Sequence, residues 1–498
     1  MRSLKANTFI LPIILLLSSV FHILRWTIGH DWGGDFAGYL SQTVSLYNGT
    51  LDEFIIYNKF TIKESDAGFG PIAYPWGFPA LLLPAYSLFG LSMFPFKLTI
   101  LFCFICFLVV IWKMFEQTLS RTENILMVSL FAFNPLLLSH SDSILSDTPF
   151  LLFSTLSIYL MQKLLFEKPS KNLFIGLALG LFFSIAVSIR SNGILLPITY
   201  CLVIAFSFLL KKGSIRSPIE SNQTINPSKH LLVQHVANLL LPLAVFLIIQ
   251  RILLYSLPYS ENVHLELLFS NFSFKSFTSN VVEYSFRLKD FFGTGYYGMG
   301  LYLLSLPFFI LGIKRSVNQD HFFLYLIYTF LIILLLLVWP FTQGIRFLFP
   351  LLPFYLFYVF LGLRIYPKKI THLFPHTLLL LIFTAASTHH ISLNLLNGRA
   401  HPDGPYSKEA IEMFHFIQEN TPLTDSIIFR KPRVLRLYTE RNSFYPKFTN
   451  IDNEVLVDWY VNDKNHDLDN ENKALLITKL QTDLVFENGR FMVFRILN

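Results

Sequence analysis

The hydrophobic positions of this chain fall into long uninterrupted blocks rather than into the periodic stripes of a soluble domain. Each block is close to the roughly 20 residues that an α-helix needs to cross a bilayer core. The pattern predicts about eleven transmembrane helices, at residues 8–28, 95–114, 124–140, 148–166, 172–189, 192–210, 232–256, 298–313, 321–340, 345–363 and 371–390. The sequence therefore predicts a polytopic membrane domain that is all-α.

One shorter apolar block, at 78–91, contains Pro79 and Pro84. A helix of this length would extend only about 21 Å, so we expect it to lie at the membrane interface. With this assignment, the loops richest in Lys and Arg all fall on the side of the N-terminus, which the positive-inside rule makes the cytoplasmic side. We expect an integral protein of the plasma or inner membrane whose N-terminus is cytoplasmic.

The composition changes sharply after the last apolar block, because charged residues become frequent. We therefore expect a transmembrane domain at 1–390 and a small soluble α/β domain at 391–498, outside the cytoplasm. In the second domain Ser407 is a favoured N-cap, and Asn488-Gly489 is the strongest short hairpin signal. The remaining predicted elements are strands at 427–429, 455–461, 483–486 and 491–496 and a helix at 472–480.

Composition and charge narrow the class of protein further. The chain is 53% hydrophobic and 14% charged, whereas soluble domains carry roughly 25% charge, which excludes a soluble enzyme. The net charge of +7 does not indicate a nucleic-acid partner, because Lys and Arg set topology in membrane proteins. Cys103 and Cys106 lie in an apolar block without a nearby His, which favours packing over metal binding. No cofactor is required, although a divalent metal stays open.

The outer loops hold the candidate acidic residues, since no Asp or Glu lies in the middle of a predicted span. Asp35 follows two glycines at the start of an amphipathic helix that we expect to lie on the membrane and to end at Gly49. Asp35 can be the helix N-cap or a carboxylate that faces a lipid headgroup, and spacing alone favours the cap. Asp147 can likewise cap its helix, and Asp142 can be solvated.

Two arginines, Arg190 and Arg346, lie at the outer ends of predicted helices. An arginine at such a position commonly extends to the lipid headgroups, but its planar fork also suits specific binding of a phosphate. Arg346 is the stronger candidate, because it is a single basic residue between two apolar segments.

A series of motifs carries a family resemblance. The order GGDFAGYL, YPWGFPALLLPAYSLFG, LSDTPFLLF, SIRSNGILL and RFLFPLLPFYLFYVFLGL resembles the GT-C superfamily of membrane glycosyltransferases. Within it, the chain is most similar to bacterial relatives of the protein O-mannosyltransferases and of the lipid A aminoarabinose transferases. The resemblance implies inverting transfer of a sugar from a polyprenyl-phosphate donor to a hydroxyl of a glycan, lipid or protein, at the outer face of the membrane.

The resemblance also implies roles for single residues. Asp35 matches the general base of the first loop, and Asp147 matches the second acidic position, although Asp142 stays an alternative to it. Arg346 matches a late basic position that faces the donor phosphate, and Arg190 matches only by its place at a helix end. Asp35 is followed by Phe where many members have a second acidic residue, so a metal requirement is not implied.

Two other classes of function fit the same pattern of spans. A flippase or transporter of lipid-linked sugars would need a polar path toward the cytoplasm, and the sequence shows none. A catalytically silent scaffold whose tail binds a partner would not need Asp35, Asp147 and Arg346, which are all present.

Overall fold

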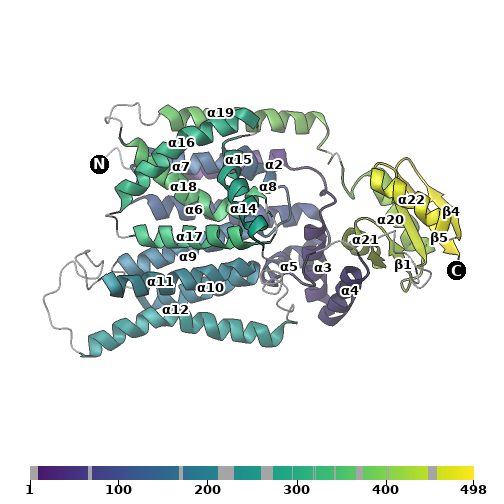
Figure 1. Ribbon diagram of the computed structural model, residues 1–498, viewed down its shortest axis with the longest axis horizontal. Helices are drawn as coiled ribbons and strands as arrows, with labels where there is room; N and C mark the ends of the chain where they lie inside the picture. Colours follow the sequence, from purple (N-terminus) through teal and green to yellow (C-terminus); the bar gives the residue numbers. More distant parts are fainter. Residues whose placement is uncertain are drawn as a thin grey trace.

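The chain is described by a computed structural model, in which the described residues are 9–65, 70–167, 172–210, 229–258, 273–293, 295–317, 319, 321–340, 342, 344–365, 374–399, 401, 403–446, 457–479 and 481–497. A bundle of apolar helices forms one part of the molecule, and a small mixed sheet with its own helices forms the other (Figure 1). The segment between the first apolar helix and Met93, called the first loop, contributes helices that lie between the two parts.

The bundle contains helices of membrane-spanning length. Among the described residues, six helices are long and apolar enough to cross a membrane: Met93–Phe115, Asp147–Phe166, Leu239–Ser256, Gly295–Ser316, Ile345–Leu363 and Phe374–Leu396. Five shorter apolar helices accompany them: Ile10–Arg25, Gly77–Phe89, Leu173–Ile189, Ser191–Phe206 and Phe322–Val338. The chain is an integral membrane protein, as its hydrophobic blocks predict.

The helical part consists of α-helices, labelled α, and short 3-10 helices, labelled η. They are α2 Ile10–Arg25, α3 Gly34–Asn48, α4 Leu51–Lys63, α5 Gly77–Phe89, α6 Met93–Phe115, α7 Arg121–Ala132, α8 Pro135–His140, α9 Asp147–Phe166, α10 Asn172–Ile189, η1 Ser191–Ile194, α11 Leu195–Leu210, α12 Lys229–Ser256, α14 Phe274–Arg287, α15 Lys289–Phe292, α16 Gly295–Ser316, α17 Phe322–Val338, η2 Ile345–Leu351, α18 Leu352–Leu363 and α19 Phe374–Leu396.

The block at 124–140 is not one helix. It is divided into α7 and α8 at Asn134, whose side chain accepts hydrogen bonds from the backbone N–H groups of Leu136 and Leu137. Pro135 follows at the first position of α8, where its missing N–H costs nothing. Asn134 and Pro135 are therefore a start signal inside an apolar block, and an interpretation by hydrophobicity alone overlooks it.

Two glycines allow α16 and α18 to approach closely. A Cβ atom at Gly312 would lie 1.8 Å from the carbonyl oxygen of Tyr358, and one at Gly362 would lie 1.8 Å from that of Phe308. No side chain fits in this space, so each glycine lets the backbone of the other helix pack directly against it. Small residues at such crossings are typical of membrane helices, where close van der Waals packing drives association.

The first loop folds into α3, α4 and α5, and α3 differs from its expected place. The apolar stripe expected on this helix consists of Phe36, Leu40, Thr43, Val44 and Tyr47. Its first three residues are buried, since α3 packs on α5 and on α21 Pro432–Thr439, whereas Tyr47 is exposed. The first half of this face therefore packs against protein. The helix ends as expected at Gly49, whose φ of 72° is the left-handed conformation that glycine adopts readily.

The C-terminal part is a five-stranded sheet in the order β2-β1-β3-β5-β4. Strands β2, β1 and β3 are parallel, and β5 is antiparallel to both β3 and β4. The Ser407 cap and the hairpin at Asn488-Gly489 are confirmed. The elements are α20 Lys408–Asn420, β1 Ser426–Ile428, α21 Pro432–Thr439, β2 Asn442–Phe444, β3 Trp459–Asp463, α22 Asp467–Lys479, β4 Gln481–Glu487 and β5 Phe491–Leu497.

Three parts of this pattern differ from expectation. The helix expected at 472–480 begins earlier, at Asp467 in α22. The sequence does not predict α21 or β2, which together form the parallel connection from β1. The strand expected at 455–461 begins later, at Trp459 in β3, and its positions 455 and 456 lie outside the described residues.

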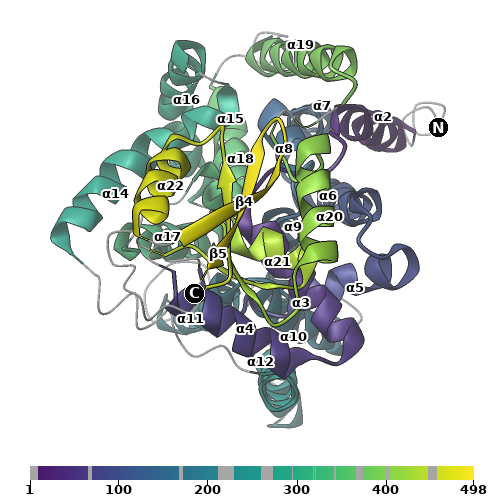
Figure 2. The same cartoon turned by 90° about the vertical axis from the view of Figure 1, so that its right-hand side faces the viewer.

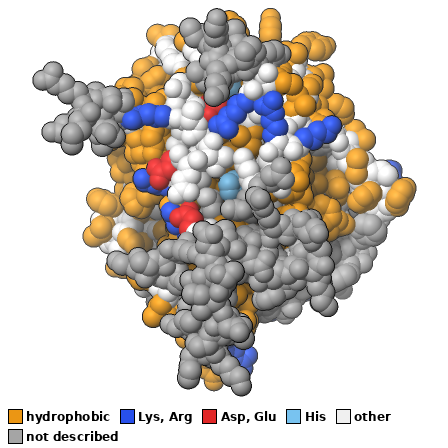
Figure 3. All heavy atoms as spheres, turned by 90° about the vertical axis from the view of Figure 1, so that its left-hand side faces the viewer, with side chains coloured by type: hydrophobic (Ala, Val, Ile, Leu, Met, Phe, Trp, Pro, Cys, Tyr) orange, Lys and Arg blue, Asp and Glu red, His pale blue; other side chains and the backbone are white. Residues whose placement is uncertain are grey.

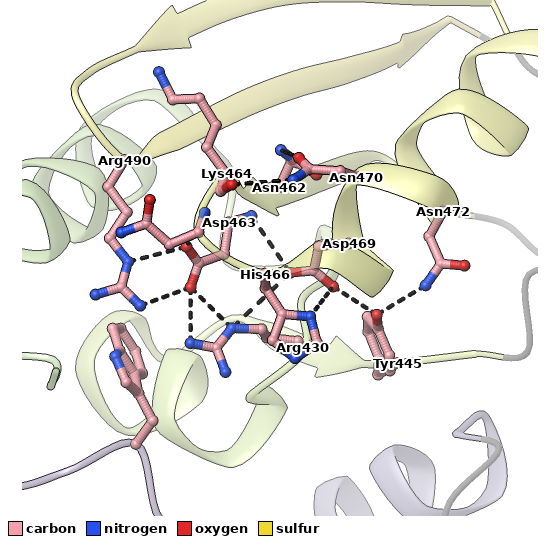
Figure 4. A network of polar contacts seen from close by, with 12 residues as sticks. Arg430, Tyr445, Asn462, Asp463, Lys464, His466, Asp469, Asn470, Asn472 and Arg490 are labelled. Carbon is pink, nitrogen blue, oxygen red and sulfur yellow. Dashed lines mark hydrogen bonds and ion pairs between the residues drawn. The ribbon is translucent and has the colours of Figure 1, made fainter.

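The C-terminal part binds the first loop through Trp32. The indole Nε1 donates to Asp403 Oδ1 at 2.8 Å, and the guanidinium groups of Arg430 and Arg490 each lie 5.5 Å from the indole ring. Both arginines also bind the fully buried Asp463, each with a nitrogen 2.7 Å from Oδ2 (Figure 4). In Figure 2 the strands lie nearest the viewer, with α21 and α3 behind them. The two parts of the chain therefore share an ordered polar contact.

The opposite end of the molecule has a different surface. Lys and Arg side chains gather there among hydrophobic ones (Figure 3). The last turns of α6, α9 and α16 contain basic residues, which are Lys113, Lys163, Lys314 and Arg315. The loop at 211–228, which supplies part of the expected cytoplasmic charge, lies outside the described residues.

Candidate active site

Asp35 lies in the first turn of α3, but it does not cap the helix. The N-cap is Gly33, and no side chain makes a capping hydrogen bond there. The carboxylate is instead held by two side chains from elsewhere in the chain: Tyr74 donates its hydroxyl to Oδ1 at 2.7 Å, and Arg346 donates Nη2 to Oδ2 at 3.1 Å. The capping interpretation that spacing favours is therefore wrong.

Asp147 is the first residue of α9, and it does not cap that helix either. Ser146 is the N-cap and makes no capping bond with its side chain, although its hydroxyl lies 2.9 Å from that of Tyr39. The Asp147 carboxylate is 3% exposed and accepts a hydrogen bond from Arg190. Its second oxygen lies 3.8 Å from Arg346 Nη1. Asp147 is thus a buried anion between two guanidinium groups.

Arg346 joins the two carboxylates. It lies in η2, which leads into α18, and its side chain is 28% exposed. The ring of Phe347 is 4.4 Å from the guanidinium carbon of Arg190 and 5.2 Å from that of Arg346. Because the aromatic face attracts both cations, Phe347 helps to hold two positive charges in one place. The structure brings together all four residues that the resemblance implicates.

Asp142, the alternative second acidic residue, belongs to a different cluster. Its carboxylate accepts hydrogen bonds from the backbone N–H and the hydroxyl of Thr27 and from the ammonium of Lys97, which is 2% exposed. These contacts join the segment just after α2, helix α6 and the loop between α8 and α9. Arg287 of α14 forms ion pairs with Glu283 and Asp290. The geometry thus favours Asp147 over Asp142 as the acidic partner of Arg346.

Three further residues near Asp35 are not candidate site residues of the sequence analysis, although Tyr39 lies in the motif GGDFAGYL and Tyr74 begins the motif YPWGFPALLLPAYSLFG. The rings of Tyr74 and Tyr39 contact each other in a tilted arrangement with centroids 4.4 Å apart, and Arg433 of α21 donates to the Tyr74 hydroxyl at 3.2 Å. Burial raises the pKa of Tyr39 to about 12 and also raises that of Tyr74, so both hydroxyl groups keep their protons near neutral pH. These contacts join positions far apart in the chain, which no local pattern reveals.

The exposed fractions of the two carboxylates suggest different chemistry. Asp35 is 40% exposed, so a substrate can reach it, whereas Asp147 is almost fully covered. An accessible carboxylate beside guanidinium groups can accept a proton while the cations stabilise an anion. Among the described residues, no group of three or more His, Cys, Asp or Glu side chains could hold a metal ion.

Comparison with known proteins adds a sequence relationship. The family of dolichyl-phosphate-mannose-protein mannosyltransferases matches residues 82–255, about a third of the chain. This segment includes Asp147 and Arg190 but neither Asp35 nor Arg346. No curated protein matches the chain by sequence.

Solved structures match nearly the whole chain. ArnT from Cupriavidus metallidurans, bound to undecaprenyl phosphate, is 10% identical with a TM-score of 0.60, and the match covers 98% of this chain and 97% of ArnT. The chain has the fold of the GT-C membrane glycosyltransferases. The archaeal oligosaccharyltransferase AglB from Archaeoglobus fulgidus, in complex with an inhibitory peptide and a dolichol-phosphate, is 12% identical with a TM-score of 0.56. That match covers 92% of this chain and 69% of AglB. The fold therefore extends through the C-terminal part as well as the helical bundle.

Proposed function

We propose that this protein is an inverting glycosyltransferase that moves a sugar from a polyprenyl-phosphate donor to a hydroxyl acceptor at the outer face of the membrane. The observation that carries the proposal is the cluster of Asp35, Arg346, Asp147 and Arg190, in which Arg346 pairs with the accessible carboxylate of Asp35 and both guanidinium groups contact the buried Asp147. The GT-C fold and the mannosyltransferase match support the same class of reaction.

Each group of the cluster has a role in this reaction. Asp35 accepts the proton of the acceptor hydroxyl, whose oxygen then forms a bond to the anomeric carbon of the sugar. The bond between that carbon and the phosphate oxygen breaks, and the lipid phosphate leaves with the electron pair. Arg346 and Arg190 stabilise the negative charge that grows on the departing phosphate. Attack opposite the phosphate inverts the anomeric centre.

Asp147 has a supporting role in this scheme. Its exposed fraction of 3% leaves little room for a substrate, and both arginines contact its oxygens. We assign it the task of orienting the two guanidinium groups, because a buried carboxylate fixes a cation more firmly than an exposed one.

The proposal extends to topology and partners. We propose eleven spans, a cytoplasmic N-terminus and a location in the plasma or inner membrane, with the division between membrane and soluble domains near residue 390. The donor is a polyprenyl-phosphate sugar, and the acceptor is a hydroxyl of a glycan, lipid or protein of the cell envelope.

The deciding experiment measures sugar transfer by the purified protein in liposomes that contain a radiolabelled polyprenyl-phosphate sugar. Asp35→Asn keeps the size of the side chain but removes the base, so we expect transfer to be lost while the protein stays folded. Asp52→Asn changes an exposed carboxylate of the same loop and should keep transfer. An Asp35→Asn variant with normal turnover would remove Asp35 from the role of base.

A further inference from the structure

Tyr74 is held firmly beside Asp35. Its backbone N–H donates to the side-chain oxygen of Gln42 at 3.0 Å, and its backbone carbonyl accepts from the side-chain nitrogen of Gln42 at 2.9 Å. Gln42 is fully buried in α3, about two helical turns after Asp35. The ring of Tyr74 packs on that of Tyr39, and its hydroxyl points to Asp35. The tyrosine is therefore fixed at its backbone, its ring and its hydroxyl.

Arg433 approaches the same tyrosine from the C-terminal part. It is 6% exposed, and its three donors reach Asn58 Oδ1 at 3.2 Å, the Tyr74 hydroxyl at 3.2 Å and the carbonyl of Pro71 at 2.8 Å. All three acceptors are neutral. Burying a cation without a nearby anion costs free energy. Among the described residues, the anion linked to Arg433 through these hydrogen bonds is Asp35, which accepts from the Tyr74 hydroxyl.

The resulting chain of hydrogen bonds runs in one direction. Arg433 donates to the Tyr74 oxygen, and the Tyr74 hydroxyl donates to Asp35. A donor that binds the oxygen of a hydroxyl polarises its O–H bond, so the hydroxyl donates more strongly to the next acceptor. Since burial raises the pKa of Tyr74, the hydroxyl remains a donor at neutral pH.

We propose that Tyr74 and Arg433 are positioning residues that hold the Asp35 carboxylate for proton transfer, so that the C-terminal part completes the active site. This inference rests on the proposed function of Asp35 as the base.

The geometry explains why a second partner for Asp35 is needed. Arg346 binds one oxygen of Asp35, but the same arginine is the expected ligand of the donor phosphate. When a phosphate draws Arg346 toward itself, Tyr74 stays on the other oxygen and keeps the carboxylate in place. The contact of Trp32 with Arg430 and Arg490 holds the C-terminal part against the residues just before Asp35.

The test compares the full-length protein with Tyr74→Phe, Arg433→Gln and the double variant in the liposome assay. Tyr74→Phe keeps the ring and removes only the hydroxyl, so we expect kcat to fall about tenfold with KM for the donor unchanged. Arg433→Gln should lower kcat by a smaller factor. Because Arg433 acts through Tyr74, the double variant should be no slower than Tyr74→Phe alone.

Two matched controls separate positioning from loss of stability. Arg441 is a buried arginine whose hydrogen bonds all stay within the C-terminal part, so Arg441→Gln should lower the unfolding temperature but keep kcat. Tyr438 donates its hydroxyl to Tyr406 and not to the first loop, so Tyr438→Phe should keep kcat as well.

The division of the effect between kcat and KM gives a readout that a loss of stability alone does not produce. A misplaced base slows the chemical step without weakening donor binding, so kcat should fall with KM for the donor unchanged in Tyr74→Phe, and kcat should stay unchanged in both controls. If Tyr74→Phe is fully active while Asp35→Asn is inactive, or if the two losses multiply in the double variant, the positioning role is wrong. If the unaltered protein transfers no sugar, the proposed function fails first and this role fails with it.

Discussion

Arg346 lies between the two carboxylates of the site, with Nη2 3.1 Å from Asp35 Oδ2 and Nη1 3.8 Å from Asp147 Oδ2. Its closer partner is the exposed carboxylate, and its more distant partner is the buried one. A phosphate that binds this guanidinium would compete with Asp35 rather than with Asp147, because only Asp35 is accessible. Donor binding would therefore leave Asp35 free to accept a proton, while Asp147 keeps the arginine in place.

The first prediction concerns the fork of Arg346. Lysine keeps the positive charge but cannot bind two oxygens at once, so we expect Arg346→Lys to lower turnover at least about tenfold and Arg346→Ala to lower it more. Initial rates of transfer in liposomes measure this. Arg441→Lys is the control, since the hydrogen bonds of Arg441 stay within the C-terminal part. Equal rates for Arg346→Lys and the unaltered protein would move the phosphate role to Arg190 and Arg287.

The second prediction separates Asp147 from Asp35. Asp147→Asn leaves two guanidinium groups without their shared anion, and loss of one partner of a buried pair commonly costs about 3–5 kcal/mol of stability. We expect a lower unfolding temperature and a turnover reduced about a hundredfold, yet above that of Asp35→Asn, because the base remains. Asp142→Asn should lower stability while turnover persists. Complete loss of transfer in stable Asp147→Asn would assign Asp147 to the chemistry itself.

The third prediction is a pH dependence in the C-terminal part. Burial by itself raises the pKa of Asp463, but hydrogen bonds and charge from Arg490 and Arg430 lower it below the usual value for Asp. A lowered folded-state pKa contributes stability that is present above the unfolded-state pKa and is lost as the pH falls through the folded-state pKa.

We therefore expect Asp463→Asn to destabilise the protein by about 3 kcal/mol near neutral pH, and the difference to shrink in strong acid. Thermal unfolding of the detergent-solubilised protein measures it. Glu487→Gln, which removes a half-exposed partner of Lys464, should change stability by less than about 1 kcal/mol. A difference that is independent of pH would show that the charge of Asp463 is not what stabilises this contact.

The fourth prediction concerns topology. A reporter inserted after Glu220 should be cytoplasmic and one at the C-terminus should be external, because the basic loops then lie on one side. Accessibility of each reporter to a membrane-impermeant reagent in intact cells distinguishes the two sides. A reporter inserted after Lys314, in the basic last turn of α16, is the control and should also be cytoplasmic. Reporters at Glu220 and the C-terminus on the same side would overturn the number of spans.

The sequence by itself determined the features that depend on neighbouring residues. Blocks of apolar residues specify the membrane helices, because the bilayer core imposes a fixed length. Ser407 and Asn488-Gly489 specify a helix start and a hairpin, because a cap and a tight turn are made by residues a few positions apart. The order of motifs also indicated the GT-C fold, and the structural comparison confirms it.

Only the tertiary structure decided how the candidate residues are used. At Asp35 and Asp147 the local expectation of a helix cap was wrong, because charged partners from distant segments bind these carboxylates instead. Arg346 is 311 positions from Asp35, and Arg433 is 359 positions from Tyr74. Helix packing and the docking of the C-terminal part bring such residues together, and a pattern that repeats every few residues carries no information about partners at these separations.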